Sequence, residues 1–119
     1  MKLKPDYAGA YDRLGQRYVQ MKKFTEAIEA LKQLALLKPG DAAAQNSLGE
    51  AYEGLNKHDE SVEAFRQAIR LKPDFGKAYF NLGKTLLGQG NRDAAIEQYV
   101  ILQNLDQDWA ERLYGLIYP

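Results

Sequence analysis

The sequence lacks cysteine altogether and has only one histidine among its 119 residues. Without thiols the chain forms no disulfide and binds no metal through thiolates, which fits a reducing compartment. Lysine plus arginine equals aspartate plus glutamate, 16 of each, so no overall positive field attracts nucleic acid or an anionic membrane. No apolar run could span a bilayer, and the first residues lack the apolar core of a signal peptide. We expect a cytoplasmic protein that neither binds nucleic acid nor inserts into a membrane.

The sequence does contain a repeat. A leucine–glycine pair returns at a constant spacing of 34 residues, as Leu14-Gly15, Leu48-Gly49 and Leu82-Gly83. The tripeptide Leu-Lys-Pro keeps the same spacing and begins at Leu3, Leu37 and Leu71. A fixed period of this size indicates stacked supersecondary units and not one closed globular core.

Each period reads as a hairpin of two helices, and the three periods are residues 8–41, 42–75 and 76–109. Apolar residues recur three and four positions apart, as is typical of amphipathic helices. Residues 108–118 predict one further helix that covers the last hairpin. The middle period has a hairpin on each side, so we expect its core residues to be the best buried: Leu48, Tyr52, Phe65 and Ile69.

Turn residues separate the two helices of each hairpin, near 21–23, at 54–56 and at 88–91. The polar residues that follow these turns are predicted to cap the second helices through their side chains: Thr25, Asp59 and Asp93. Apolar positions of the first helix include Leu14, which we expect to pack toward the core.

The first seven residues match the end of a period, because Leu3-Lys4-Pro5-Asp6 parallels the segment at 71–74. Asp6 is then placed to cap the first helix. We therefore expect the chain to be a fragment of a longer array.

These positions resemble the tetratricopeptide repeat, whose pattern is W-x2-L-G-x2-Y, then A-x3-F, then P. The first aromatic position holds Tyr11, Gln45 and Tyr79, and the second holds Tyr18, Tyr52 and Leu86. The last three landmarks hold Ala27, Ser61 and Ala95, then Leu31, Phe65 and Tyr99, then Pro39, Pro73 and Gln107. The match covers residues 8–109. It implies one all-α domain over residues 1–119, a right-handed superhelical stack of antiparallel hairpins with seven helices.

The glycine of each leucine–glycine pair lies inside a predicted helix, where glycine costs roughly 1 kcal/mol relative to alanine. Each therefore needs a packing reason. We expect close approach of the paired helix, with Ala27, Ser61 and Ala95 as the small counterparts.

No constellation typical of catalysis occurs in the sequence. The single histidine, His58, falls in an inter-helix turn without an oriented neighbour, and we interpret it as a solvated surface residue. The pair Asp59-Glu60 fits the start of a helix better than acid–base chemistry. Residues 88–91 are glycine-rich, but no strand precedes them and no Gly-Lys-Ser/Thr follows, as a phosphate loop requires. We expect no catalytic residue, no metal and no cofactor.

The resemblance implies that the first helices line a concave groove where extended peptides commonly bind. The candidate groove residues lie between the packing positions of these helices: Arg13, Gln16, Asn46, Ser47, Glu50, Lys77, Phe80, Asn81 and Lys84. Amides and charges can bond a peptide's backbone and termini, and an exposed Phe80 offers an apolar contact. The alternative for these residues is a solvated helix face. We predict a non-catalytic scaffold for a peptide or partner protein, with recognition leaning toward the third period.

One specific partner is testable against the sequence. Family members that grip the C-terminal carboxylate of chaperones carry Lys, Asn, Asn, Lys and Arg at positions that here hold Asp12, Gln16, Ser47, Lys77 and Asn81. Only Lys77 matches, so the sequence argues against a typical chaperone clamp.

Self-assembly is the second hypothesis. The candidate contacts are Tyr7 and Tyr11 on the first hairpin, and Trp109, Tyr114 and Tyr118 on the last helix. End-to-end stacking, or a dimer through the last helix, would bury them. An enzymatic role survives only as a subunit that positions a catalytic partner.

Overall fold

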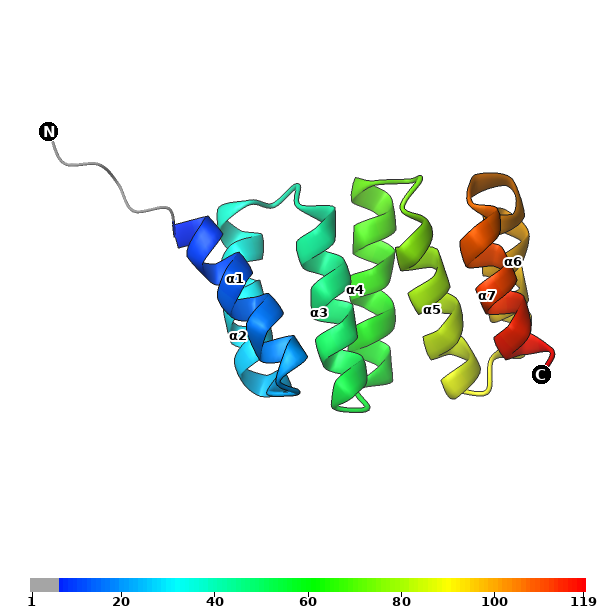
Figure 1. Cartoon of the computed structure of the whole chain (residues 1–119), viewed down its shortest axis with the longest axis horizontal. Helices are drawn as coiled ribbons and strands as arrows, with labels where there is room; N and C mark the ends of the chain where they lie inside the picture. Colours follow the sequence, from blue (N-terminus) through cyan, green and yellow to red (C-terminus); the bar gives the residue numbers. More distant parts are fainter. Residues whose placement is uncertain (1–6) are drawn as a thin grey trace, which may run out of the picture.

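The computed structural model describes residues 7–119, which form seven α-helices. They are α1 (Tyr7–Gln20), α2 (Phe24–Leu37), α3 (Ala42–Gly54), α4 (His58–Leu71), α5 (Gly76–Gly88), α6 (Arg92–Leu105) and α7 (Gln107–Ile117). Each helix packs antiparallel against the one before it, and the hairpins stand side by side along the long axis (Figure 1). The predicted all-α stack of hairpins is confirmed.

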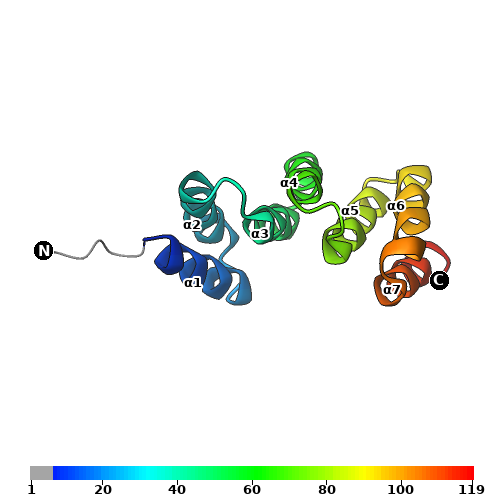
Figure 2. The same cartoon turned by 90° about the horizontal axis from the view of Figure 1, so that it is seen from above.

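The helices form two layers, with the odd-numbered helices on one side and the even-numbered helices on the other (Figure 2). The backbones of neighbouring odd-numbered helices approach one another closely, whereas those of α2, α4 and α6 stay farther apart. When the helices of one layer stand closer together than those of the other, the stack curves toward the layer with the closer spacing. We therefore name the surface of α1, α3, α5 and α7 the concave face, and the surface of α2, α4 and α6 the convex face.

The apolar core runs through the stack as three neighbouring clusters, each shared between hairpins. The first joins Leu31 and Leu34 of α2 to Leu48 of α3. The second is built around Phe65 and Leu82, and the third brings α7 against α5 and α6. Leu48 and Phe65 are buried as predicted, but the other two expected core residues of the middle period, Tyr52 and Ile69, are only half-buried.

Leu14 departs from the expected apolar stripe, because its side chain is 45% exposed. Its equivalents one and two periods later, Leu48 and Leu82, are buried against residues of the preceding hairpin. Among the described residues no hairpin precedes α1, so Leu14 has no such surface to pack against.

The helical glycines make room for large side chains of a facing helix. A Cβ atom on Gly49 would lie 2.4 Å from Cε1 of Phe65, and one on Gly15 would lie 2.6 Å from Cδ2 of Leu31. Both partners belong to the second helix of the same hairpin, so the predicted close approach is confirmed for these two.

The expected small counterparts Ala27, Ser61 and Ala95 are wrong, because the atoms that face the three glycines belong to large residues. The three atoms nearest to a Cβ on Gly83 all belong to Leu113 of α7, and not to its paired helix α6. Ser61 does reach Gly49, but by donating a hydrogen bond from its hydroxyl to the Gly49 carbonyl at 2.8 Å.

The turns fall where the sequence predicts them, but the caps do not. Helices α2, α4 and α6 begin two residues earlier than expected, so the predicted caps Thr25, Asp59 and Asp93 are each the second residue of a helix. The side chains that do accept a bond from a helix N-terminus are Asp41, Asn91 and Asp106. The predicted cap Asp6 lies outside the described residues. No helix within residues 7–119 is long and apolar enough to cross a bilayer.

Candidate functional site on the concave face

A seam of polar side chains joins the odd-numbered helices. At its N-terminal end Gln16 of α1 donates from Nε2 to the hydroxyl of Ser47 on α3, at 2.9 Å. Gln16 itself remains exposed, whereas Ser47 is buried between the helices. The prediction that Ser47 lies on a free surface is therefore wrong.

The centre of the seam is Asn81, which is only 5% exposed. Its amide donates to Oδ1 of Asn46 at 3.1 Å and to Oε2 of Glu50 at 3.4 Å. Lys77 reaches the same Glu50 oxygen at 3.7 Å. Asn46 and Asn81 were expected to face a ligand, but both are buried where α3 meets α5. They hold two repeats together, because a buried amide is costly unless it is bonded.

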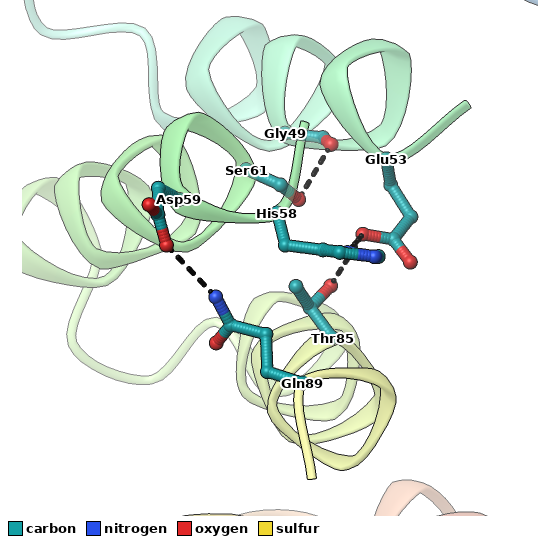
Figure 3. A network of polar contacts seen from close by, with 7 residues as sticks. All are labelled: Gly49, Glu53, His58, Asp59, Ser61, Thr85 and Gln89. Atoms are coloured by element: carbon teal, nitrogen blue, oxygen red, sulfur yellow. Dashed lines mark hydrogen bonds and ion pairs between the residues drawn. The ribbon is translucent and has the colours of Figure 1, made fainter. Parts of the chain in front are cut away.

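The seam continues around Glu53, where α3, α4 and α5 meet (Figure 3). The hydroxyl of Thr85 donates to Oε1 of Glu53 at 3.2 Å, and Nδ1 of His58 lies 3.0 Å from the same oxygen. Gln89 then donates to Asp59 at 2.9 Å. His58 is therefore not a solvated turn residue: it begins α4, is half-buried and faces a carboxylate.

Glu53 and Thr85 escaped the sequence reasoning, although one signal was present. Thr85 stands one period after Ala51, at a position that is buried in both helices. A hydroxyl in the place of a buried methyl needs a hydrogen-bond partner, and Glu53 supplies it.

An aromatic pair flanked by cations lies where α5 meets α7. The rings of Phe80 and Trp109 are 4.9 Å apart between centroids. The Lys84 ammonium lies 5.8 Å from the Phe80 ring, and the Arg112 guanidinium lies 4.7 Å from the Trp109 ring. Phe80 is thus half-buried against Trp109, and not the exposed ring that the sequence suggested.

The cations of this cluster are available to a ligand. Lys77, Lys84 and Arg112 are all exposed, and within residues 7–119 neither Lys84 nor Arg112 has a carboxylate partner. Arg112 was missed because periodicity placed α7 only as a covering helix. Arg13, the remaining predicted groove residue, is exposed on α1 and makes no contact with this cluster.

The two ends of the stack expose aromatic side chains unequally. Tyr7 is 58% exposed, whereas Tyr11 packs half-buried against the first core cluster. At the other end Tyr114 stacks between Tyr99 and Tyr118, with centroid distances of 5.5 and 4.9 Å.

Trp109, the third aromatic candidate at this end, packs its ring on Phe80. Trp109 is half-buried there, whereas the other aromatic candidates on this end are exposed. Tyr114 of α7 and Tyr118, which follows that helix, are the exposed aromatic residues at that end.

Among the titratable groups of residues 7–119, the phenol of Tyr79 has a shifted pKa. Burial raises the pKa of the Tyr79 phenol above its usual value, and the charge of Asp74 raises it further. The phenol donates to the carbonyl oxygen of Pro73 at 2.9 Å. Among the described residues no three His, Cys, Asp or Glu side chains are grouped so that they could hold a metal ion.

The fold closely matches several solved structures. The TPR2B domain of yeast Sti1, solved as a complex with pHsp70, superimposes with a TM-score of 0.90 over 96% of this chain and 95% of that one, at 19% sequence identity. MamA from Desulfovibrio magneticus RS-1 matches with a TM-score of 0.83 over 88% of this chain, at 26% identity. Another crystal structure of MamA is 31% identical over 87% of this chain, with a TM-score of 0.81. The present chain spans 59% and 61% of the two MamA chains.

None of the functionally curated proteins matches this sequence. A family model does, because the tetratricopeptide repeat model matches residues 13–74 and 52–108. The two matches overlap and together cover most of the chain. With seven helices in hairpins and the same fold in the solved structures, the chain belongs to the tetratricopeptide repeat family.

Proposed function

We propose that the protein is a non-catalytic scaffold that binds an extended acidic peptide on its concave face, at the surface of α5 and α7. The observation that supports it is the cluster of Phe80 and Trp109 between Lys84 and Arg112. The rings offer an apolar platform, and the two cations have no carboxylate partner within the described residues.

Charge favours an acidic ligand at this end of the concave face. Lys77 is only partly compensated by Glu50, since their charged atoms are 3.7 Å apart and both side chains are partly exposed. Lys84 is one helical turn from Phe80 on α5, so a carboxylate seated over the rings can reach a cation on either side. Exposed pairs of this kind contribute little each, and affinity would come from several acting together.

The TPR2B domain of Sti1 was solved with pHsp70, a precedent for a protein-derived partner on this fold. That partner does not transfer to this chain, because only one of the five residues expected of a chaperone clamp is present. We therefore propose a class of ligand and not a chaperone terminus.

The direct test is a titration with a defined peptide, acetyl-Gly-Asp-Glu-Leu-Asp-Gly-amide. The matched control replaces each carboxylate by its amide, which keeps the shape and removes the charge. Reversing Lys77 and Lys84 together to glutamate should weaken the acidic peptide about tenfold. The control variant Lys38→Glu changes an exposed lysine in the loop after α2 and should leave the affinity unchanged. Equal binding of both peptides, or no effect of the double reversal, refutes the site.

Asn81→Ala is a poor probe of this function, although Asn81 belonged to the predicted groove. Its amide bridges Asn46 and Glu50, so its loss leaves the buried Asn46 and the partly exposed Glu50 without this donor and weakens the packing of α3 on α5. Substitutions at exposed cations test binding without that side effect.

The second candidate is self-assembly through the end faces. Tyr7 at one end, and Tyr114 and Tyr118 at the other, expose aromatic surface that a second copy would cover. Light scattering over a concentration series should then show a rising mass that falls in Tyr114→Glu. A strict monomer at high concentration contradicts this candidate.

A further inference from the structure

The convex face carries two hollows that the repeat builds from equivalent positions. The one between α2 and α4 has a volume of about 480 Å³, and the one between α4 and α6 about 300 Å³. The first is lined by Lys32, Ala35, Leu36, Gln45, Leu48 and Gln67, with Pro39. Residues one period later line the second: Arg66, Ile69, Arg70, Tyr79, Leu82 and Ile101.

The main difference between the hollows is one aromatic ring. In the second, Tyr79 is buried and its hydroxyl donates to the Pro73 carbonyl at 2.9 Å. In the first, Gln45 takes that position, and its side chain makes no hydrogen bond within residues 7–119. Ala35 also replaces the larger Ile69. The α2–α4 hollow is larger because it lacks a ring and part of a branched side chain.

The α2–α4 hollow keeps what an incoming ring needs. Leu48 forms its floor and Ala35 one wall, while Leu36 stands 74% exposed at its rim. Pro39 lines it one period before Pro73, whose carbonyl accepts the Tyr79 hydroxyl. Tyr79 therefore indicates, within the same chain, the kind of side chain that fits there.

Acidic side chains of α4 line the groove next to the α2–α4 hollow. A third hollow of about 250 Å³ continues along α3 toward Tyr52 and is lined on the α4 side by Glu60 and Glu63. Glu63 pairs with Arg70, but Glu60 has no ionic partner within the described residues. Gln67 lines both the α2–α4 hollow and this third one. It is seven residues from Glu60, or about 10 Å along the helix. That distance is about three residues of extended peptide.

We propose that the groove between α2 and α4 binds a partner peptide that presents a tryptophan or tyrosine ring and, three residues away, a lysine or arginine. The ring occupies the place that Tyr79 fills in the next repeat, and the basic residue lies against Glu60 and Glu63. This site is on the opposite face from the acidic-peptide site and prefers the opposite charge. Failure of one proposal in its test therefore does not contradict the other.

The test uses acetyl-Gly-Trp-Gly-Gly-Arg-Gly-amide and the same peptide with tryptophan and arginine exchanged. Methyl resonances of Ala35 and Leu48 should shift in a saturable way with one of the two orders. Replacing the tryptophan by alanine should weaken binding about tenfold or more, because the ring supplies most of the buried apolar area. Replacing the arginine by glutamate should weaken it about two- to fivefold.

Two variants separate this groove from the rest of the surface. Gln45→Tyr places in the first hollow the residue that both other repeats carry, and should abolish the shifts while raising the thermal stability. Glu60→Lys should weaken the arginine peptide and strengthen its glutamate analogue, without any demand on the core. The matched control Lys77→Glu, on the concave face, should leave the affinity as it is. Unshifted methyl resonances, or unchanged binding by both groove variants, overturn the proposal.

Discussion

Replacing Gly49 by alanine tests how the hairpins are held together. Alanine is the better helix former by roughly 1 kcal/mol, so propensity alone predicts stabilisation. The structure predicts the opposite, because the added Cβ would lie 2.4 to 2.7 Å from three carbons of the Phe65 ring. That ring is 1% exposed and belongs to the core, so it cannot swing out into solvent.

The magnitude follows from these two opposing effects. Adding a methyl group to a well-packed core costs about 1–3 kcal/mol, and contacts this short place Gly49 at the upper end. After the gain in propensity we expect a net destabilisation of about 2 kcal/mol. For a domain of this size that corresponds to a melting temperature lower by roughly 8 °C.

The matched control is Gly115→Ala in α7. No heavy atom lies within 4 Å of a Cβ added at Gly115, so only propensity acts and we expect stabilisation of roughly 1 kcal/mol. Urea unfolding followed by far-ultraviolet circular dichroism measures both changes. If Gly49→Ala is as stable as Gly115→Ala, the close packing of α3 on Phe65 is refuted.

Three further predictions concern stability. Lys22 has φ of 59° at the turn position where the next repeat has Asn56, so Lys22→Asn should stabilise by about 0.5 kcal/mol in urea unfolding. The pKa of Tyr79 is raised in the folded state, so its stabilising contribution is complete below the unfolded value of about 10 and is lost as the pH rises through the folded value. The alkaline fall in melting temperature should therefore be smaller in Tyr79→Phe. Asn81→Leu should destabilise by about 1–3 kcal/mol, because the Asn46 amide loses its buried partner. Equal stability of the variant would contradict a stabilising role for this hydrogen bond between α3 and α5.

The fold could be predicted well from the sequence because the same pattern of residues occurs three times. A spacing of 34 residues gives the period, the leucine–glycine pairs give the first helices, and the Leu-Lys-Pro tripeptides give the ends of the second helices in two of the three periods. Helix caps were less predictable. The short polar residues Thr25, Asp59 and Asp93 look like caps, yet each falls inside its helix, since the boundary lies two residues before the expected position.

The site was predicted less well than the fold, for a physical reason. Helical periodicity tells which face of its own helix a residue occupies, but not how near the next odd-numbered helix stands. Asn46, Ser47 and Asn81 do lie on the predicted faces, and the neighbouring helix then buries them. Phe80 was misjudged in the same way, because its contact with Trp109 depends on where α7 packs.

Trp109 allows the most direct measurement of the central claim. It is the only tryptophan in the chain and lies within the proposed peptide site, next to Phe80 and Arg112. Its fluorescence should change saturably as the acidic peptide acetyl-Gly-Asp-Glu-Leu-Asp-Gly-amide is added, and the response should shift about tenfold to higher concentration when Lys77 and Lys84 are both reversed to glutamate. An unresponsive Trp109, or an identical curve for the reversed variant, would contradict a peptide-binding role for this face.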